Sequence, residues 1–421
     1  MKIAILGNGG RENALAYQVY KSRNVSKIYC LPGNAGTKKV AENIDINIEN
    51  FNEILNFIKK MYIDLVIVGP EKPLVGGITD FLKENNVSVF GPGKFVSQLE
   101  GSKIFTKEIC KKYDIPTANF GVFKSEEGAN NFLDKSNFPI VIKSDGLAAG
   151  KGVYVCKNLG EAKKATKEVF DGKFGLAKEI LVEEFLDGEE MSYFIISDGL
   201  NYKSFNTAQD HKRVGEGDIG KNTGGMGAYS PSGLINKELE KKILERIIEP
   251  TLKALKDMGK EYVGFLYAGL MIKNNNPYLI EYNVRMGDPE CQTILPLLKS
   301  DFMSLILATV NKKLKDTSIE WHNKKSLCIV LCSKGYPDHY EKNIEVCKED
   351  SLSFSEDNFI FHAGTKLENN KIFAIGGRVL NFVSVSESFL LSRNKIIEDI
   401  QKLNWKEGYF RSDIGYRIIN K

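Results

Sequence analysis

The sequence predicts a chain of mixed α/β and α+β structure, with a parallel, doubly wound sheet at its N-terminal end. Short apolar runs alternate with helical patterns over residues 1–93, and Gly or Pro follows each run. This alternation is typical of a parallel sheet with helices on both faces. The length of 421 residues corresponds to about three domains of roughly 150 residues each. We therefore expect further units after this sheet.

The composition is ordinary for a folded protein and excludes several classes. Hydrophobic residues make up 42% of the chain and charged residues 27%, which excludes long disordered or collagen-like segments. The net charge of +4 does not indicate binding to nucleic acid or to an acidic lipid surface. The opening MKIAILGNGG does not resemble a signal peptide, and no apolar run approaches the ~18 residues that span a bilayer. We expect a cytoplasmic protein without nucleic-acid or membrane partners.

The cysteines do not form a metal or disulfide pattern. The seven cysteines are scattered without a CxxC pair, and only four histidines are present, so neither a zinc site nor a disulfide framework is expected. Cys328 and Cys332 should be plain buried thiols, because free cysteine behaves as a small hydrophobic residue.

Four strands and two helices are expected in the N-terminal unit. The strands cover Lys2–Leu6, Lys27–Leu31, Asp64–Val68 and Val87–Phe90, and the helices cover Arg11–Lys21 and Phe51–Lys60. In a parallel sheet, ligands bind just beyond the carboxyl ends of the strands. The turns that follow the four strands should therefore line one ligand-binding edge.

The middle of the chain combines strands with a helix and two glycine-rich stretches. Strands are expected at Pro139–Lys143, Val153–Cys156 and Ile180–Phe185, and a helix at Leu159–Phe170. The polar, glycine-rich stretch 207–232 is too long for an ordinary connection and is expected to be a functional loop.

The remaining elements alternate between helices and strands. A helix is expected from Asn236 to about Lys256, bent at Pro250. The strands Tyr262–Ile272 and Pro277–Asn283 should form a hairpin around three consecutive asparagines. After about residue 323, short strands and a helix at Val383–Leu403 are expected to form a small α+β domain.

The first glycine loop, residues 7–10, favours an anion site over a dinucleotide site. A dinucleotide fingerprint needs a glycine where Glu12 stands, and an acidic residue where the second strand ends at Pro32-Gly33. What remains is a strand-to-helix turn whose N–H groups, with Arg11 beside them, suit a phosphate monoester. The alternative is a tight turn that needs glycine only for packing.

A second glycine loop, in the segment PIVIKSDGLAAGKG at 139–152, points to phosphate binding. Lys143 ends an apolar strand, and Lys151 follows among small residues that let a backbone close over phosphates. The alternative is a flexible surface hairpin. Further on, the acidic segment 183–190 is similar to an adenosine-binding hinge, although acidic turns are usually solvated surface.

The segment YLIEYNVRMGDPE at 278–290 is the strongest chemical signal. Glu281 and Asn283 are two residues apart on a strand, so their oxygens project to one face. A carboxylate and an amide carbonyl suit Mg²⁺, which also keeps water and phosphate ligands. Arg285 continues that face and suits an anionic substrate group. The alternative is an ordinary half-exposed strand.

In the polar stretch 207–232, His211 is interpreted as a hydrogen-bonding side chain in preference to a general base.

Sequence blocks occur in a fixed order along the whole chain. They are GNGGRE at 7–12, PGNAGT at 32–37, VGPE at 68–71, FGP at 90–92, LEGSK at 99–103, IKSDGLAAGKGV at 142–153, VEEFLDGEE at 182–190, QDHKR at 209–213, NTGGMGAYSP at 222–231, GFLYAGLM at 264–271, GDPE at 287–290, HAGT at 362–365 and GGRVL at 376–380. Together they resemble the phosphoribosylamine–glycine ligase family of the ATP-grasp superfamily.

The resemblance implies a domain plan and a reaction. It implies a Rossmann-like substrate domain at 1–100, an ATP-grasp domain at 101–323 with a mobile lid at about 119–190, and a C-terminal domain at 324–421. The implied reaction joins glycine to 5-phosphoribosylamine with ATP and Mg²⁺ or Mn²⁺, through a glycyl phosphate, as the second step of purine biosynthesis. The alternative is another ATP-grasp carboxylate–amine ligase. A monomer or homodimer is expected.

The family's site residues map onto matching positions of this chain. The implied ATP-binding residues are Lys103, Lys143, Gly146, Gly150, Lys151, Gly152, Glu183, Glu184, Phe185, Leu186 and Glu190. The implied substrate-binding residues are Gly9, Gly10, Gly33, Asn34, Glu71 and Gly225. Arg285, Asp210 and Lys212 are implied to place the substrates for catalysis, and Glu281 and Asn283 to hold the metal. The chain departs from the family pattern at Asn13, Ser144 and Met286.

Overall fold

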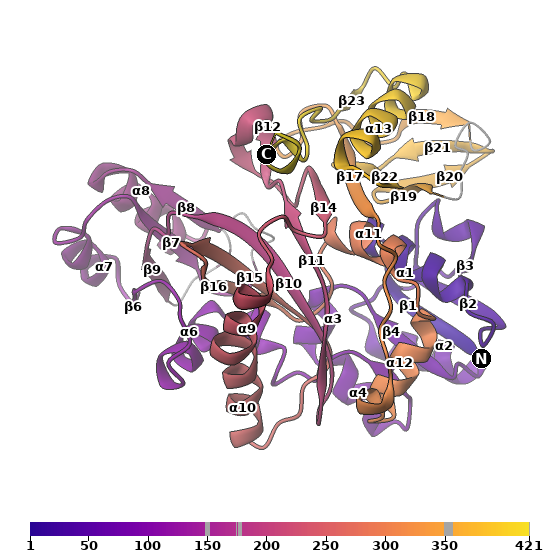
Figure 1. Ribbon diagram of the computed structural model, residues 1–421, viewed down its shortest axis with the longest axis horizontal. Helices are drawn as coiled ribbons and strands as arrows, with labels where there is room; N and C mark the ends of the chain where they lie inside the picture. The colour runs from indigo at the N-terminus through magenta and orange to yellow at the C-terminus, as the bar shows by residue number, and fades with distance from the viewer. Residues whose placement is uncertain (148–151, 174, 176–178, 349–356, 421) are drawn as a thin grey trace.

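The computed structural model describes residues 1–147, 152–173, 175, 179–348 and 357–420. Its elements form a body with the N-terminal sheet on one side and the C-terminal strands above it, and a separate lobe projects from the other side (Figure 1). In the described residues, no helix is long and apolar enough to cross a membrane.

The N-terminal sheet has five parallel strands in the order β3-β2-β1-β4-β5. The elements are β1 Lys2–Gly7, α1 Gly10–Tyr20, β2 Lys27–Pro32, β3 Glu42–Asn43, α2 Phe51–Met61, β4 Leu65–Val68, α3 Glu71–Gly76, α4 Ile78–Glu84 and β5 Val89–Phe90. Ile3 and Ile5 pack into one hydrophobic cluster, whereas Ala4 and Leu6 pack into another. Both faces of β1 are therefore buried, which explains its uninterrupted apolar sequence and confirms the predicted doubly wound sheet.

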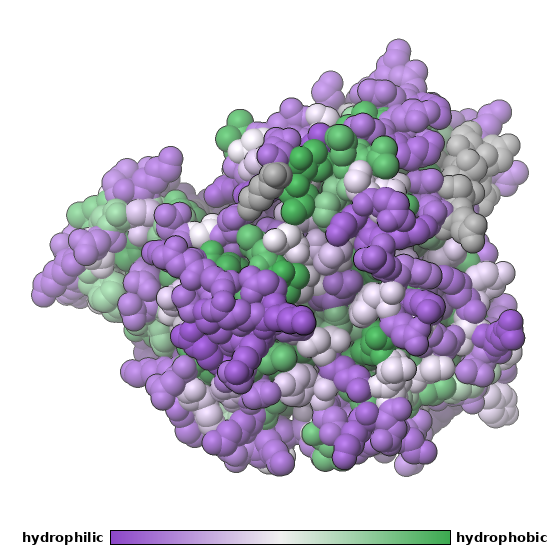
Figure 2. All heavy atoms as spheres, in the orientation of Figure 1, coloured by the Kyte–Doolittle hydropathy of each residue, from purple (hydrophilic) through white to green (hydrophobic). Residues whose placement is uncertain are grey.

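The projecting lobe has its own four-stranded antiparallel sheet, in the order β6-β9-β7-β8. Its elements are β6 Phe120–Phe123, α7 Glu126–Leu133, β7 Ile140–Ser144, β8 Val153–Cys156, α8 Leu159–Phe170 and β9 Ile180–Glu184. Ile142, Val182 and Val169 lie in a hydrophobic cluster that belongs to this lobe alone. Figure 2 shows the lobe standing out from the body with an indentation beside it. A small separate core of this kind suits a part that moves as one unit.

The central sheet has nine strands, all antiparallel. They are β10 Glu189–Asp198, β11 Tyr202–Asp210, β14 Gly227–Ser230, β15 Val263–Lys273, β16 Asn276–Asn283, β17 Lys325–Ser333, β19 Asn358–His362, β22 Arg378–Ser386 and β23 Gly408–Tyr409. β14 and β17 are hydrogen-bonded to each other, so the sheet includes strands from both sides of the expected boundary at residue 323. The expected C-terminal α+β unit therefore shares a sheet with the middle of the chain.

The stretch 207–232 is not a long loop, so that prediction was wrong. It contains the end of β11, the hairpin β12 (Arg213–Gly215) and β13 (Ile219–Asn222), and β14. Its glycines and polar residues do not show the pattern of a strand. β14 forms because it pairs with β17, about a hundred residues away along the chain. A pairing partner at that distance leaves no local pattern in the sequence.

The remaining helices and strands surround this sheet. They are α5 Gln98–Gly101, α6 Lys103–Lys112, α9 Lys237–Ile243, α10 Glu249–Asp257, α11 Glu290–Ile294, α12 Phe302–Val310, β18 Ile344–Lys348, β20 Thr365–Glu368, β21 Lys371–Ala374, α13 Phe389–Leu403 and α14 Tyr416–Ile419. A π-helical turn at Leu244–Ile248 separates α9 from α10, just before Pro250, which has no N–H to donate. The predicted hairpin of β15 and β16 is confirmed, and Asn274 and Asn275 at its turn both have positive φ, as a tight hairpin requires.

The helix predicted from Val383 begins six residues too early. Residues 383–386 belong to β22, and α13 begins at Phe389 after the N-cap Ser388. Val383 and Val385 are buried β-branched residues that alternate with serines, the period of a strand. The serine hydroxyl of Ser388 accepts a hydrogen bond from the N–H of Leu391 at 3.2 Å, which fixes where the helix starts.

Removal of this cap should measurably destabilise the C-terminal part. We expect Ser388→Ala to lower the free energy of unfolding by about 1 kcal/mol, because a free N–H is left at the start of α13. Thermal unfolding of the variant should show a lower Tm, and Ser388→Asp, which keeps a capping oxygen, should restore it. Equal Tm values for the alanine and aspartate variants would contradict this role.

Candidate active site

The first glycine loop satisfies its N–H groups with carboxylates of the protein. Gly9 N–H donates to Glu12 Oε2 at 2.6 Å, and Arg11 N–H donates to Asp288 Oδ2 at 3.0 Å. The Arg11 guanidinium also faces inward, donating to Glu12 Oε1 and to the carbonyl of Met286. In this structure these groups bond to carboxylates of the protein itself, and phosphate binding at the turn stays a prediction. Glu12 and Asp288 supply the anionic groups that a helix start attracts.

Gly10 and Asn34 pack closely at the same edge of the sheet. A Cβ on Gly10 would lie 2.4 Å from Asn381 Nδ2, so only glycine fits there. Asn34 Nδ2 donates to the carbonyls of Asn8 and His362 at 2.9 and 2.8 Å. Gly33, with φ of 74°, makes the turn before it, which favours glycine. The predicted substrate residues thus lie together where β1 and β2 end, joined to the C-terminal strands.

Arg285 links this edge to the helices that follow. It lies after β16 and pairs with Glu71 at 3.2 Å and Glu100 at 2.6 Å. The Arg285 charge holds the pKa of Glu71 at about 2, well below its usual range. Burial has the larger effect on Glu100 and raises the pKa of that carboxyl. Arg285 is therefore held in place by two carboxylates at the site, and its family role as an anion-placing residue remains a prediction.

The Glu71 pair makes stability depend on pH in a defined window. Since the folded pKa of about 2 lies below the ordinary 4.5, ionised Glu71 stabilises the folded chain above pH ~4.5, and this contribution disappears as the pH falls toward 2. We expect the Tm difference between the parent chain and Glu71→Gln to be largest near neutral pH and to shrink across that window. A difference that does not change with pH would contradict the assignment.

Two lysines and one glutamate form a buried ion cluster under the lobe. Glu183 Oε2 lies 2.7 Å from Lys143 Nζ, and Glu183 Oε1 lies 2.8 Å from Lys107 Nζ. All three side chains are at most 5% exposed. The two ammonium groups lower the pKa of Glu183 against the opposing effect of burial. The Glu183 carboxylate therefore orders Lys107 and Lys143, and the expected contact of Glu183 with adenine stays a prediction.

Lys103 holds the stem of the second glycine loop. Its Nζ donates to the carbonyls of Ser144 and Gly146 at 3.1 and 2.8 Å. The Asp145 carboxylate accepts from Ser102 Oγ and from the N–H of Ile104, so the start of α6 anchors the loop. Gly152 is buried next to β8. The predicted residues Gly150 and Lys151 lie outside the described residues.

The segment after β9 presents its backbone and a partly exposed ring. Glu184 accepts hydrogen bonds from the backbone N–H and the side chain of Asn119, at 3.1 Å each. Phe185 is 39% exposed, and Leu186 follows it as a half-buried residue. Residues 184–186 thus lie where the chain passes from β9 of the lobe to β10 of the central sheet.

Glu281 and Asn283 are acceptors without donors in the described structure. Both lie on β16, opposite Gly269 and Tyr267 of β15. Among the described residues, no group donates a hydrogen bond to either side chain. Burial lowers the pKa of Lys103 against the opposing charge of Glu281, and Glu281 adds to the effect of Glu190 that raises the pKa of Lys212. A carboxylate and an amide oxygen that accept no hydrogen bond from the described residues thus lie two residues apart on one strand, and such a donor set fits a hard divalent cation such as Mg²⁺.

Asp210 and Lys212 lie on either side of a buried histidine at the end of β11. Lys212 Nζ pairs with Glu190 Oε2 at 2.7 Å, and this carboxylate raises the pKa of Lys212 against the effect of burial. Asp210 Oδ1 is buried and has no hydrogen-bond partner in the described chain. Burial, and next the charge of Glu290, raise the pKa of Asp210 well above its usual range. The predicted substrate-placing pair and the predicted ribose residue thus lie in one cluster.

Gly225 completes this cluster because no side chain fits at its position. Its φ is 109°, and a Cβ there would lie 2.5 Å from Pro289 Cδ and 2.8 Å from Asp210 Oδ1. We expect Gly225→Ala to displace Asp210 and to lower kcat/KM for the amino-acid substrate by ~10-fold to 100-fold. Gly259→Ala is the matched control, since it has φ of 70° with nothing within 4 Å of the new Cβ. Equal activity of the two variants would contradict the role of Gly225.

Three residues of the site were not singled out in the sequence analysis. Lys107, Glu100 and Arg378 join the site only through contacts far along the chain. Arg378 Nη1 donates to the carbonyls of Gly224 and Asp288 at 2.6 and 2.7 Å, joining the C-terminal strands to the site. Helical spacing was the one clue for Lys107, which lies four residues after Lys103 on α6.

The three departures from the family pattern all lie in contact with the site's framework. Asn13 Oδ1 accepts from the N–H of His362 at 2.8 Å. The carbonyl of Met286 accepts from Arg11 and Arg285, and that of Ser144 accepts from Lys103. The Met286 and Ser144 contacts use backbone atoms, so these side chains are exchangeable without loss of the contact.

Comparison with known proteins shows the family of the chain. Family models for phosphoribosylglycinamide synthetase match the chain as the N domain at 1–100, the ATP-grasp (A) domain at 101–291 and the C domain at 326–417. Relatives named phosphoribosylamine–glycine ligase are 43% identical in Brucella melitensis and 44% identical in Agrobacterium fabrum, each over 100% of this chain and 99% of the relative.

Solved structures agree on the fold as well. The crystal structure of phosphoribosylamine–glycine ligase from Thermotoga maritima is 34% identical and has a TM-score of 0.87, covering 99% of this chain and 100% of that one. A biotin carboxylase from Campylobacter jejuni, 15% identical with a TM-score of 0.72 over 95% of this chain and 91% of that one, shares the fold alone. These matches confirm the resemblance and the ATP-grasp fold predicted from the sequence. The chain belongs to the phosphoribosylglycinamide synthetase family, the family of the phosphoribosylamine–glycine ligases.

Proposed function

We propose that this chain joins glycine to 5-phosphoribosylamine with the consumption of ATP, giving glycinamide ribonucleotide, ADP and phosphate. One observation carries the proposal beyond family membership. The unpartnered carboxylate of Glu281 acts on Lys103, at the phosphate loop, and on Lys212, in the cluster with Asp210. The proposed nucleotide and substrate sites would therefore meet at the side-chain oxygens of Glu281 and Asn283.

The nucleotide would lie between the lobe and the body. Lys103 and Lys143 would neutralise the phosphates, with Lys143 aligned by its 2.7 Å pair to Glu183. Residues 184–186 would border the adenine, and Glu190 would accept from the ribose hydroxyls. The lobe, within the lid predicted at 119–190, would close over ATP and exclude water from the phosphoryl group.

The chemistry requires positioning and charge neutralisation. An oxygen of the glycine carboxylate attacks the γ-phosphorus of ATP and ADP leaves, so glycine becomes an acyl phosphate. The amine of phosphoribosylamine then attacks the carbonyl carbon, and phosphate leaves with the oxygen that glycine contributed. Glu281 and Asn283 would hold Mg²⁺ or Mn²⁺, which supplies charge neutralisation on the phosphates when bound.

The chain's own residues would place the two substrates. The unpartnered Asp210 carboxyl and Lys212 lie where the ammonium and carboxylate of glycine would be held. The edge formed by Gly9, Gly10, Gly33, Asn34 and Glu71 would take the phosphoribosyl group. No side chain is required as a nucleophile, because both attacking atoms come from the substrates.

ADP release by the purified chain tests the proposal. We expect release only when Mg-ATP, glycine and phosphoribosylamine, formed in situ from ribose 5-phosphate and ammonia, are all present. Release with another amino acid in place of glycine would instead assign a different carboxylate–amine ligase. Absence of release under every combination would overturn the proposal.

A further inference from the structure

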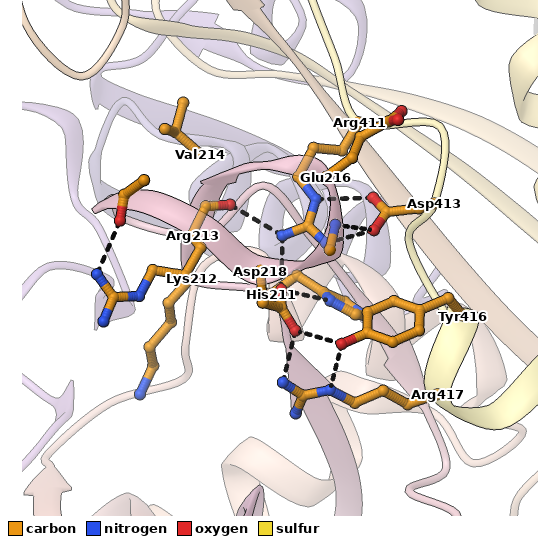
Figure 3. A network of polar contacts seen from close by, with 12 residues as sticks. His211, Lys212, Arg213, Val214, Glu216, Asp218, Arg411, Asp413, Tyr416 and Arg417 are labelled. Carbon is orange, nitrogen blue, oxygen red and sulfur yellow. Dashed lines mark hydrogen bonds and ion pairs between the residues drawn. The ribbon is translucent and has the colours of Figure 1, made fainter.

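The last residues of the described chain form a network against the start of the β12–β13 hairpin (Figure 3). Arg411 is fully buried, and its Nη1 donates to the carbonyl of Arg213 at 2.9 Å and to Asp218 Oδ1 at 2.7 Å. Its other nitrogens donate to the Asp413 carboxylate at 2.8 Å. Because an unpaired buried charge is very costly, these hydrogen bonds and ion pairs are what allow Arg411 to be buried here.

Asp218 is the centre of the network. Its carboxylate accepts hydrogen bonds from Arg411, from the hydroxyl of Tyr416 at 2.9 Å, and from Arg417. It also lies 3.3 Å from His211 Nδ1. These donors hold the pKa of Asp218 far below its usual range, although burial acts in the opposite direction. Three residues of the C-terminal segment therefore converge on one carboxylate beside the active site.

His211 connects this network to the substrate-placing residues. Its Nε2 accepts a hydrogen bond from the N–H of Gly415 at 3.1 Å, so the proton of the neutral ring is on Nδ1, which donates to Asp218. The ring is 2% exposed, and burial lowers its pKa. With both ring nitrogens engaged by the protein itself, His211 is not placed to act as a general base.

The backbone at His211 continues the antiparallel pairing of β11 with the segment leading into β14. The N–H of His211 donates to the carbonyl of Gly227 at 2.9 Å, and its carbonyl accepts from Met226 at 2.8 Å. Because successive side chains of an extended segment alternate between faces, Asp210 and Lys212 point away from His211. Figure 3 shows Lys212 directed away from the network that surrounds the histidine. A displacement of the His211 ring is therefore expected to displace Asp210 and Lys212, its neighbours in the chain.

We infer that residues Arg411, Asp413, Gly415, Tyr416 and Arg417, here called the C-terminal clasp, act through Asp218 and His211 to position Asp210 and Lys212 for the ligation. The inference rests on the proposed function of the chain. The clasp residues do not touch the reacting atoms in this account, so they are positioning residues. Substitutions in the clasp should therefore lower kcat/KM for glycine and phosphoribosylamine and should leave the affinity for the nucleotide largely unchanged.

Variants on both sides of the contact test the inference. In His211→Ala and Arg411→Met we expect kcat/KM for glycine to fall by ~10-fold to 100-fold, while the Kd of a fluorescent ADP analogue changes by less than about threefold. His211→Gln, whose amide still reaches Gly415, should recover part of the loss. Tyr416→Phe, which removes one hydroxyl from Asp218, is the mildest variant and should give a smaller loss if the others do not fold.

The control is a variant that loses a similar amount of stability through a substitution outside the clasp. Ile58→Ala opens a cavity beside α2, in the core of the N-terminal sheet, where Ile58 is 2% exposed. It should lower Tm but leave kcat/KM for glycine unchanged. The inference is overturned if the clasp variants that fold lower Tm as the control does and keep the parent kcat/KM. A parent chain that binds the ADP analogue but never forms product would overturn the proposed function instead.

Discussion

Replacement of Glu281 by Gln is expected to lower the rate of ADP release by at least ~100-fold at saturating ATP. Glutamine keeps the shape of the side chain but removes the charge that faces Lys103 and Lys212. Two amide oxygens, one from the new glutamine and one from Asn283, would be a weaker donor set for Mg²⁺. The rate of ADP release measured against Mg²⁺ concentration should therefore show both a lower maximum and a higher Mg²⁺ requirement.

The matched control for this change is Glu238→Gln. Glu238 is an exposed glutamate of α9, paired with Lys242 at 2.7 Å, and its variant should keep the parent rate. Retention of the parent rate and of the parent Mg²⁺ dependence by Glu281→Gln would contradict the metal site at β16.

The second large effect is expected for Glu183→Ala. Removal of this carboxylate leaves the ammonium groups of Lys107 and Lys143 buried without their shared partner, at 3% and 5% exposure. Breaking a buried ion pair in this way costs about 3–5 kcal/mol of stability. Chemical unfolding should show that loss, and the affinity for ATP should fall because Lys143 is no longer aligned.

A double variant separates the two consequences. Lys107→Met combined with Glu183→Ala removes one of the stranded charges, so it should be more stable than Glu183→Ala alone while still binding ATP weakly. Glu320→Ala, in an exposed pair with Lys299 at 2.9 Å, is the control and should change stability by less than about 1 kcal/mol. Equal effects of Glu183→Ala and Glu320→Ala would contradict the buried cluster.

Local patterns were sufficient for much of the fold. The predicted bounds of Val153–Cys156 and Leu159–Phe170 agree with β8 and α8, because Asn158 caps the helix and the strand residues are β-branched or aromatic. The helix was expected to begin at Val383, but this residue alternates with serines as a strand residue does and pairs with Cys328 and Phe359. Within 207–232, β14 also has a remote partner, β17, whereas β12 and β13 pair with each other.

The candidate site follows the same rule. Glu281 and Asn283 were found from their spacing on one strand, which is a local property. Of the two carboxylates at the first glycine loop, Glu12 lies in the adjacent sequence, whereas Asp288 lies 277 residues from Arg11 and has no local signal. Likewise, the partners of Glu183 lie on α6 and β7, and His211 meets a segment about two hundred residues later. Contacts between distant segments decide what a charged residue does, and a single sequence does not show them.

The most direct test of the central claim follows one oxygen atom. Ligation by way of a glycyl phosphate predicts that glycine labelled with ¹⁸O in its carboxylate transfers one labelled oxygen to the phosphate released in each turnover. Mass spectrometry of that phosphate, in a reaction that also contains ATP and phosphoribosylamine, measures the transfer. Labelled phosphate in equal amount to glycinamide ribonucleotide is the expected result. Product accompanied by unlabelled phosphate would contradict activation of the glycine carboxylate by ATP.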